Sequence, residues 1–161
     1  MIRILRRFAP ILAIGAAMLV HPSPATAQVR TGIGVGGKLL VPTGDLKDEV
    51  KSGWGIAGTG ELALLGILSG VTELSYNRFP AEDGMRGDGS SYDSKDVFGF
   101  TAGARIYLSM LFAGLDVGYF TAVDDGGLLP NIGLRIALFE VMGRYKWTGD
   151  NWFELRGTIS F

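Results

Sequence analysis

The strongest constraint in this sequence is the alternation of residues in its last ten positions, 152–161, which read WFELRGTISF. Counting back from the final residue, one side of an extended chain carries Phe153, Leu155, Gly157, Ile159 and Phe161. The other side carries Glu154, Arg156, Thr158 and Ser160. A period of two places alternate side chains on opposite faces of a β-strand. The end of the chain is therefore predicted to be a strand with one apolar face.

Residues 1–27 are predicted to be a removable export signal. Arg3, Arg6 and Arg7 form a basic start, residues 11–20 are apolar, and the segment 25–27, Ala-Thr-Ala, is a small-residue cleavage site. The apolar run of about ten residues is too short to cross a bilayer as a helix, which takes roughly 20 residues. We therefore expect one folded domain over residues 28–161.

The folded part lacks the side chains on which many enzymes depend. Residues 1–27 hold three of the 15 basic residues, none of the 16 acidic residues and the single histidine, His21. Residues 28–161 therefore carry 12 basic and 16 acidic residues, a net charge of −4, and there is no cysteine. A Ser-His-Asp triad, a cysteine nucleophile, a disulfide and an ordinary zinc site are excluded. No cofactor or metal site is predicted, and the mild acidity argues against binding to nucleic acid.

Eight segments show strand-like alternation, and no apolar run after residue 27 approaches the roughly 18 residues of a membrane-spanning helix. The predicted strands are 29–41, 54–65, 68–79, 96–108, 111–121, 128–138, 141–147 and 152–161. Long polar connections follow the first, third and fifth strands, whereas short ones follow the second, fourth and sixth. Long loops at one end and tight turns at the other are typical of an eight-stranded antiparallel up-and-down transmembrane β-barrel.

Alternation alone leaves the direction of the apolar face open, because a soluble lipocalin-like barrel would turn that face inward. The polar face is crowded with glycine, which a narrow interior requires and a water-facing surface does not. These glycines are Gly32, Gly34, Gly36, Gly99, Gly103, Gly114, Gly118 and Gly133. We therefore predict that the apolar face points outward.

Aromatic side chains gather toward one end of the predicted strands, as they do in the interfacial girdle of a membrane barrel. The predicted girdle is Trp54, Tyr76, Phe98, Tyr119, Trp147 and Trp152, with Phe139 and Phe161 at the opposite rim. A soluble barrel offers no common reason for these side chains to lie at one level.

Four features together resemble the small OmpA/OmpX-like outer-membrane β-barrels: the export signal, the eight strands, the terminal Phe161 and the segment 36–48, GGKLLVPTGDLKD. The resemblance implies a location in the cell outer membrane, in contact with outer-membrane lipid and lipopolysaccharide. It also implies export with the help of periplasmic chaperones and the barrel-assembly machinery. The implied assembly signal is Phe153, Leu155, Gly157, Ile159 and Phe161.

With the apolar face outward, the barrel interior would hold six basic and four acidic side chains. They are Lys38, Glu61, Glu73, Arg105, Asp116, Arg135, Arg144, Lys146, Glu154 and Arg156. Removing one partner of a buried ion pair costs about 3–5 kcal/mol, so we expect these charges to pair and form a salt-bridged lumen. The alternative is a narrow path for small solutes or ions, although an eight-stranded barrel is normally filled by its own side chains.

These observations favour a non-enzymatic outer-membrane barrel that contributes to envelope structure and to surface recognition through its loops. The surface ligand is not predicted. Three alternatives stay open: a narrow channel, a secreted soluble lipocalin-like ligand-binding barrel, and a lipid-modifying enzyme with a site such as Ser90, Ser91 and Tyr92. The assignment of faces also predicts that Leu134→Arg is costly and that Gly133→Ser is tolerated.

Overall fold

The computed structural model describes residues 32–83, 91–121, 125–147 and 149–161. The predicted export signal, residues 1–27, lies outside the described residues, and so does Ser90.

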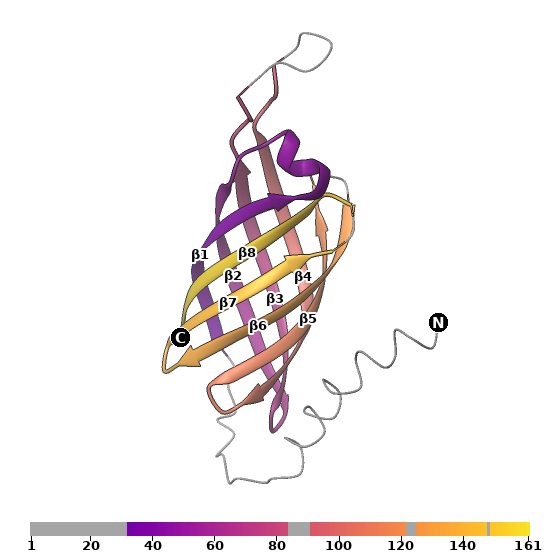
Figure 1. Ribbon diagram of the computed structural model, residues 1–161. Helices are drawn as coiled ribbons and strands as arrows, with labels where there is room; N and C mark the ends of the chain where they lie inside the picture. The colour runs from indigo at the N-terminus through magenta and orange to yellow at the C-terminus, as the bar shows by residue number, and fades with distance from the viewer. Residues whose placement is uncertain (1–31, 84–90, 122–124, 148) are drawn as a thin grey trace, which may run out of the picture.

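The described chain forms a closed antiparallel barrel in which each strand pairs with the next (Figure 1). Its strands are β1 Gly32–Thr43, β2 Gly53–Leu65, β3 Leu68–Phe79, β4 Lys95–Leu108, β5 Leu111–Phe120, β6 Asp125–Ile136, β7 Phe139–Lys146 and β8 Asn151–Ser160. The predicted eight-stranded up-and-down β-barrel is confirmed. Within the described ranges, no helix is long and apolar enough to cross a membrane.

The pairing of β8 with β1 closes the sheet. The ladder runs from Gly34 opposite Ser160 to Thr43 opposite Asn151. Phe161 extends it, because its N–H donates to the Ile33 carbonyl at 2.8 Å and its carbonyl accepts from the Ile33 N–H at 3.2 Å. Through this pairing, each of the eight described strands is paired along both of its sides over most of its length.

The two ends of the barrel differ. Two-residue turns at 66–67, 109–110 and 137–138 lie at the lower end of Figure 1, near the C-terminus. Each contains a residue with positive φ (Gly66, Ser109 and Ala137), as tight hairpin turns require. At the upper end, the 3-10 helix η1 (Gly44–Asp48) follows β1. We call the two ends the turn end and the loop end.

Pro42 was expected to end the first strand, but β1 continues to Thr43. The β1–β2 ladder stops where Leu40 lies opposite Gly53, whereas Pro42 still lies opposite Trp152 of β8. Beyond Leu40, β1 is therefore paired on one side only, and proline is tolerated in such edge positions.

The barrel is apolar outside and polar inside. Every strand carries large apolar side chains that are at least 40% exposed, from Ile33 on β1 to Phe153 on β8. The buried side chains include Lys38, Glu73 and Arg144. A water-soluble domain has the opposite distribution, with charged residues almost never fully buried unless paired.

Most of the predicted aromatic girdle faces outward at the loop end. Trp54, Tyr76 and Phe98 stack across β2, β3 and β4, with ring centroids 6.1 Å and 5.2 Å apart. Tyr119 and Trp147 are also exposed, as are Phe139 and Phe161 at the turn end.

The prediction for Trp152 is wrong, because this side chain points into the barrel and is 1% exposed. Its ring centroid lies 5.0 Å from that of Phe120 and 5.6 Å from that of Phe79. Trp152 shares the even positions of β8 with Glu154 and Arg156, which face inward, so the alternation of the strand dictates its direction.

The geometry around Gly133 argues against the predicted tolerance of Gly133→Ser. Gly133 faces inward, and a Cβ built there would lie 2.4 Å from the Phe112 ring and 2.5 Å from the Val141 carbonyl oxygen. Inward glycines therefore provide room for neighbouring large side chains.

Candidate functional site

Glu73 of β3 is one centre of the buried charges. Its Oε1 lies 2.5 Å from the Lys38 ammonium and 2.7 Å from the Arg144 guanidinium, and its Oε2 pairs with Arg156. All four side chains are at most 3% exposed. One carboxylate thus holds three cations from three different strands.

Glu140 of β7 is the second centre. It pairs with Arg105 at 3.0 Å, Arg156 at 2.8 Å and Arg135 at 2.6 Å, and it is 2% exposed. Glu140 lies between the predicted strands 128–138 and 141–147 and was not predicted among the interior charges. Its even position on β7, shared with the inward-facing Arg144, was the signal that could have found it.

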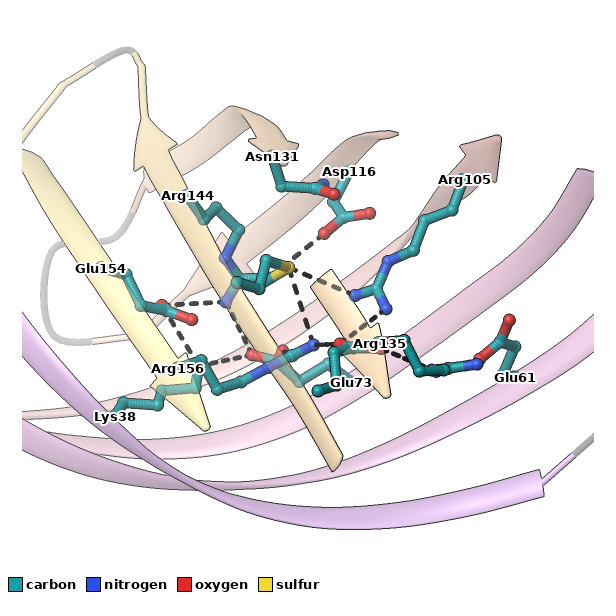
Figure 2. A network of polar contacts seen from close by, with 12 residues as sticks. Lys38, Glu61, Glu73, Arg105, Asp116, Asn131, Arg135, Arg144, Glu154 and Arg156 are labelled. Atoms are coloured by element: carbon teal, nitrogen blue, oxygen red, sulfur yellow. Dashed lines mark hydrogen bonds and ion pairs between the residues drawn. The ribbon is translucent and has the colours of Figure 1, made fainter. Parts of the chain in front are cut away.

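Arg156 joins the two centres, because its guanidinium contacts both Glu73 and Glu140 (Figure 2). Arg144 also pairs with Asp116 at 3.2 Å and Glu154 at 2.9 Å. Arg135, which pairs with Glu140, also pairs with Glu61 of β2 at 2.5 Å. Glu154 also lies 3.3 Å from Lys38.

The ion pairs form one connected set that we call the lumen network. Its members are Lys38, Glu61, Glu73, Arg105, Asp116, Arg135, Glu140, Arg144, Glu154 and Arg156. Every strand contributes at least one member, and five basic residues face five acidic ones. The network therefore crosslinks the whole wall and carries no net charge when all its members are ionised.

A methionine and two aromatic side chains pack against the lumen network. The Met142 sulfur lies 3.5 Å from Arg105 and 3.7 Å from Arg156. The Arg105 guanidinium lies 4.9 Å from the Phe112 ring centroid, and that of Arg135 lies 5.1 Å from the Tyr107 ring centroid. These cation–π contacts supplement the ion pairs.

Lys146, which was predicted among the same charges, is fully buried and lies next to two aromatic rings. Its ammonium donates to the Asp150 carbonyl at 2.8 Å and lies 5.0 Å and 5.6 Å from the ring centroids of Trp152 and Phe120. Lys146 thus belongs to an apolar layer nearer the loop end.

That layer closes the mouth of the barrel, and we call it the mouth cluster. It consists of Leu40, Leu46, Val50, Phe79, Val97, Phe120, Leu129 and Trp152, each at most 2% exposed. Leu46 comes from η1 and Val50 from the segment after it, so the first connection folds over the opening. From the sequence, this connection was predicted only to be long and polar. Two apolar residues four positions apart in a charged stretch were the available signal.

Backbone hydrogen bonds and ion pairs attach this first connection to neighbouring segments. The Lys51 N–H donates to the Pro80 carbonyl at 2.8 Å, and the Glu82 N–H donates to the Glu49 carbonyl at 3.0 Å. Lys95 pairs with Glu49 at 2.7 Å. The hydrogen bond that Lys51 donates to Asp83 raises the pKa of its ammonium group.

The remaining candidates are spread over the surface. Of the predicted assembly signal, Phe153, Leu155, Ile159 and Phe161 are at least 40% exposed, and Gly157 also faces outward. Ser91 is exposed on the connection before β4. No group of three or more His, Cys, Asp or Glu side chains in the described part of the chain is placed to hold a metal ion.

No protein-family model matches the chain, and no curated protein matches it. Among solved structures, the chain is similar to the outer membrane protein Ail of Yersinia pestis in a phospholipid bilayer nanodisc. The identity is 12%, the match covers 82% of this chain and 100% of that chain, and the TM-score is 0.46.

Proposed function

We propose that this protein is an integral β-barrel of a cell outer membrane. The observation that carries the proposal is the outward exposure of large apolar side chains on all eight strands. Exposing so extensive an apolar surface to water is unfavourable. Soluble monomers accordingly rarely expose contiguous apolar patches beyond a few hundred Å². A hydrocarbon environment removes that cost, and a closed barrel leaves no backbone edge unpaired within it.

The aromatic side chains support the same placement. Trp54, Tyr76 and Phe98 lie together at the loop end, whereas Phe139 and Phe161 lie at the turn end. Aromatic girdles of this kind occur at both membrane–water interfaces of outer-membrane barrels. The strands between them would then cross the hydrocarbon layer.

We further propose that the barrel is a non-enzymatic structural and surface-display protein and not a channel. The lumen network and the mouth cluster occupy successive levels of the interior, so a solute would have to displace both. Surface recognition would then fall to the loop end, where η1 and the connections after β3, β5 and β7 lie.

A secreted soluble ligand-binding barrel is less compatible with these observations. Such a barrel would need an apolar interior to hold its ligand, yet the middle of this interior holds Glu73, Arg144 and Arg156. Its exterior would also have to be polar.

Cell fractionation combined with heat-modifiable gel migration tests the proposal. We expect the protein in the outer-membrane fraction, with a compact band before boiling that shifts after boiling. Recovery as a detergent-free periplasmic protein would contradict the proposal.

A further inference from the structure

A groove of about 790 Å³ hollows the outer face of the barrel over β1–β4. Gly37 of β1 and Gly58 of β2 lie in it, and a Cβ at either position would meet no heavy atom within 4 Å. Val35, Ile56 and Leu74 line its sides. Because hydrogen replaces a side chain at two outward positions, the apolar surface dips there. We call this depression the β1–β4 groove.

The groove changes character toward the loop end. Tyr76 and Phe98 line it, and Trp54 stacks on Tyr76. The Tyr76 hydroxyl donates to Asp96 at 2.8 Å. Arg78, the next outward residue on β3, lies opposite Trp54 and Asp96 and is about half exposed. From the groove toward the loop end, the outer surface of the barrel is therefore first apolar, then aromatic, then charged.

We propose that the β1–β4 groove binds one acyl chain of an outer-leaflet lipid whose headgroup carries an anionic phosphate. The chain lies along Gly37 and Gly58, and the phosphate lies beside Arg78. This inference rests on the proposed membrane location, which puts acyl chains against the groove and headgroups at the aromatic level. Arginine suits the headgroup, because its planar guanidinium matches the geometry of phosphate.

Asp96 gives Arg78 a defined place without burying it. The Arg78 Nε lies 3.9 Å from the Asp96 carboxylate, which also accepts the bond from Tyr76. Arg78 follows Tyr76 at the next outward position of β3, toward the loop end, where a headgroup would lie. A second copy of the chain is the competing occupant, and the experiment below separates it from a lipid.

The experiment measures quenching of tryptophan fluorescence by lipids with brominated acyl chains. The whole mature protein is placed in phosphatidylcholine bilayers that contain either brominated phosphatidic acid or brominated phosphatidylcholine. In the Trp147→Phe protein, Trp54 is the exposed tryptophan and lies beside the groove. In the Trp54→Phe protein, Trp147 is the exposed tryptophan and lies away from the groove, directly after β7. Trp152 is buried in both proteins.

We expect Trp54 to select phosphatidic acid over phosphatidylcholine about fivefold, which corresponds to the roughly 1 kcal/mol of one arginine near an anionic headgroup. Trp147 should show no such selection. In the Trp54 reporter, Arg78→Gln should abolish the selectivity, and Gly58→Leu should lower quenching by both lipids. The matched controls, Lys47→Gln in the first loop and Gly143→Leu on β7, should behave like the unsubstituted reporter. Heat-modifiable migration establishes that each variant is folded.

Equal quenching of Trp54 by the two lipids would overturn the inference, as would unchanged selectivity in folded Arg78→Gln. Loss of Trp54 quenching at high protein-to-lipid ratio, together with disulfide-linked pairs of Gly58→Cys, would assign the groove to a second copy instead. Absence of quenching at both Trp54 and Trp147 would overturn the membrane proposal itself. Failure of the groove and failure of the proposed function are therefore distinguishable.

Discussion

At the scale of single residues, buried charge is tolerated here because two central carboxylates each pair with several cations. Glu73 and Glu140 each hold three, and Arg156 belongs to both sets. Pairs of this kind are sensitive to the loss of one member, since the remaining charges stay buried without compensation. Exposed ion pairs such as Lys95–Glu49 lack this sensitivity because water screens them.

Glu140→Gln should destabilise the barrel strongly. The change removes the only carboxylate that pairs with Arg105 in the described residues, so we expect a loss of about 3–5 kcal/mol in the free energy of unfolding. Denaturant titration of the protein in detergent micelles measures this value. Glu49→Gln is the matched control, with an expected loss of about 1 kcal/mol or less. Similar values for the two variants would contradict the role of the lumen network.

Gly133→Ala should be harmful although it adds one methyl group. The added Cβ would overlap the Phe112 ring and the Val141 carbonyl oxygen, and such overpacking costs about 1–3 kcal/mol. Gly58→Ala is the matched control, because its Cβ would meet no heavy atom within 4 Å. The denaturant midpoints of the two variants should therefore differ clearly. Equal midpoints would mean that the interior can relax around Phe112.

At the scale of elements, η1 links the first connection to the barrel interior. Leu46 packs in the mouth cluster together with Val50, while backbone bonds at Lys51 and Glu82 tie the connection to the one after β3. The first connection is therefore part of the fold and not a freely displayed loop. Its polar residues, such as Asp45 and Lys47, remain available at the surface.

Leu46→Ala should loosen the first connection while the strands stay paired. Removing a buried leucine side chain costs at least about 2 kcal/mol, which would raise the population of the locally open state about 30-fold. Hydrogen exchange followed by mass spectrometry should show faster exchange over residues 44–52 and unchanged exchange in β4 and β5. Lys47→Ala, an exposed neighbour, should leave the exchange as it is. Faster exchange throughout the barrel would show that η1 supports the strands as well.

At the scale of the whole molecule, the distribution of polarity determines the environment. Apolar side chains face outward on every strand, and ten charged side chains of the lumen network are gathered inside. Tolerance of charge should therefore depend on depth along the outer face. Leu134, near the middle of the predicted strand 128–138, lies near the turn end of β6, whereas Leu115 lies midway along β5.

Leu115→Arg should cost about 2–4 kcal/mol, because its outward side chain would sit near the middle of the hydrocarbon. Leu134→Arg should cost about 1 kcal/mol or less, since arginine near an interface can reach the headgroups. Reversible unfolding from lipid bilayers measures both values. Equal costs at the two positions would contradict the proposed orientation in the membrane.

The purified barrel should give no resolvable current in planar lipid bilayers at 100 mV. We expect ions to find no continuous aqueous path, because the lumen network and the mouth cluster occupy different levels of the interior. A sixteen-stranded porin reconstituted in the same way provides the positive control. Stable unit conductance from this protein would support the narrow channel that the sequence left open.

The sequence by itself determined the strands. Alternation with a period of two depends only on local backbone geometry, so β3 was predicted with its observed bounds and the other strands to within a few residues. The same local rule placed Lys38, Glu73 and Arg156 on one face. Connection lengths then separated the loop end from the turn end.

The tertiary structure decided which of these residues meet. The contacts of Glu140 with Arg105 and Arg156 and the overlap at Gly133 depend on how neighbouring strands are staggered. Alternation within one strand does not encode that stagger, because it says which face a side chain occupies and not its height in the barrel. The folding of η1 over the mouth likewise depends on an opening that exists only once β8 has closed against β1.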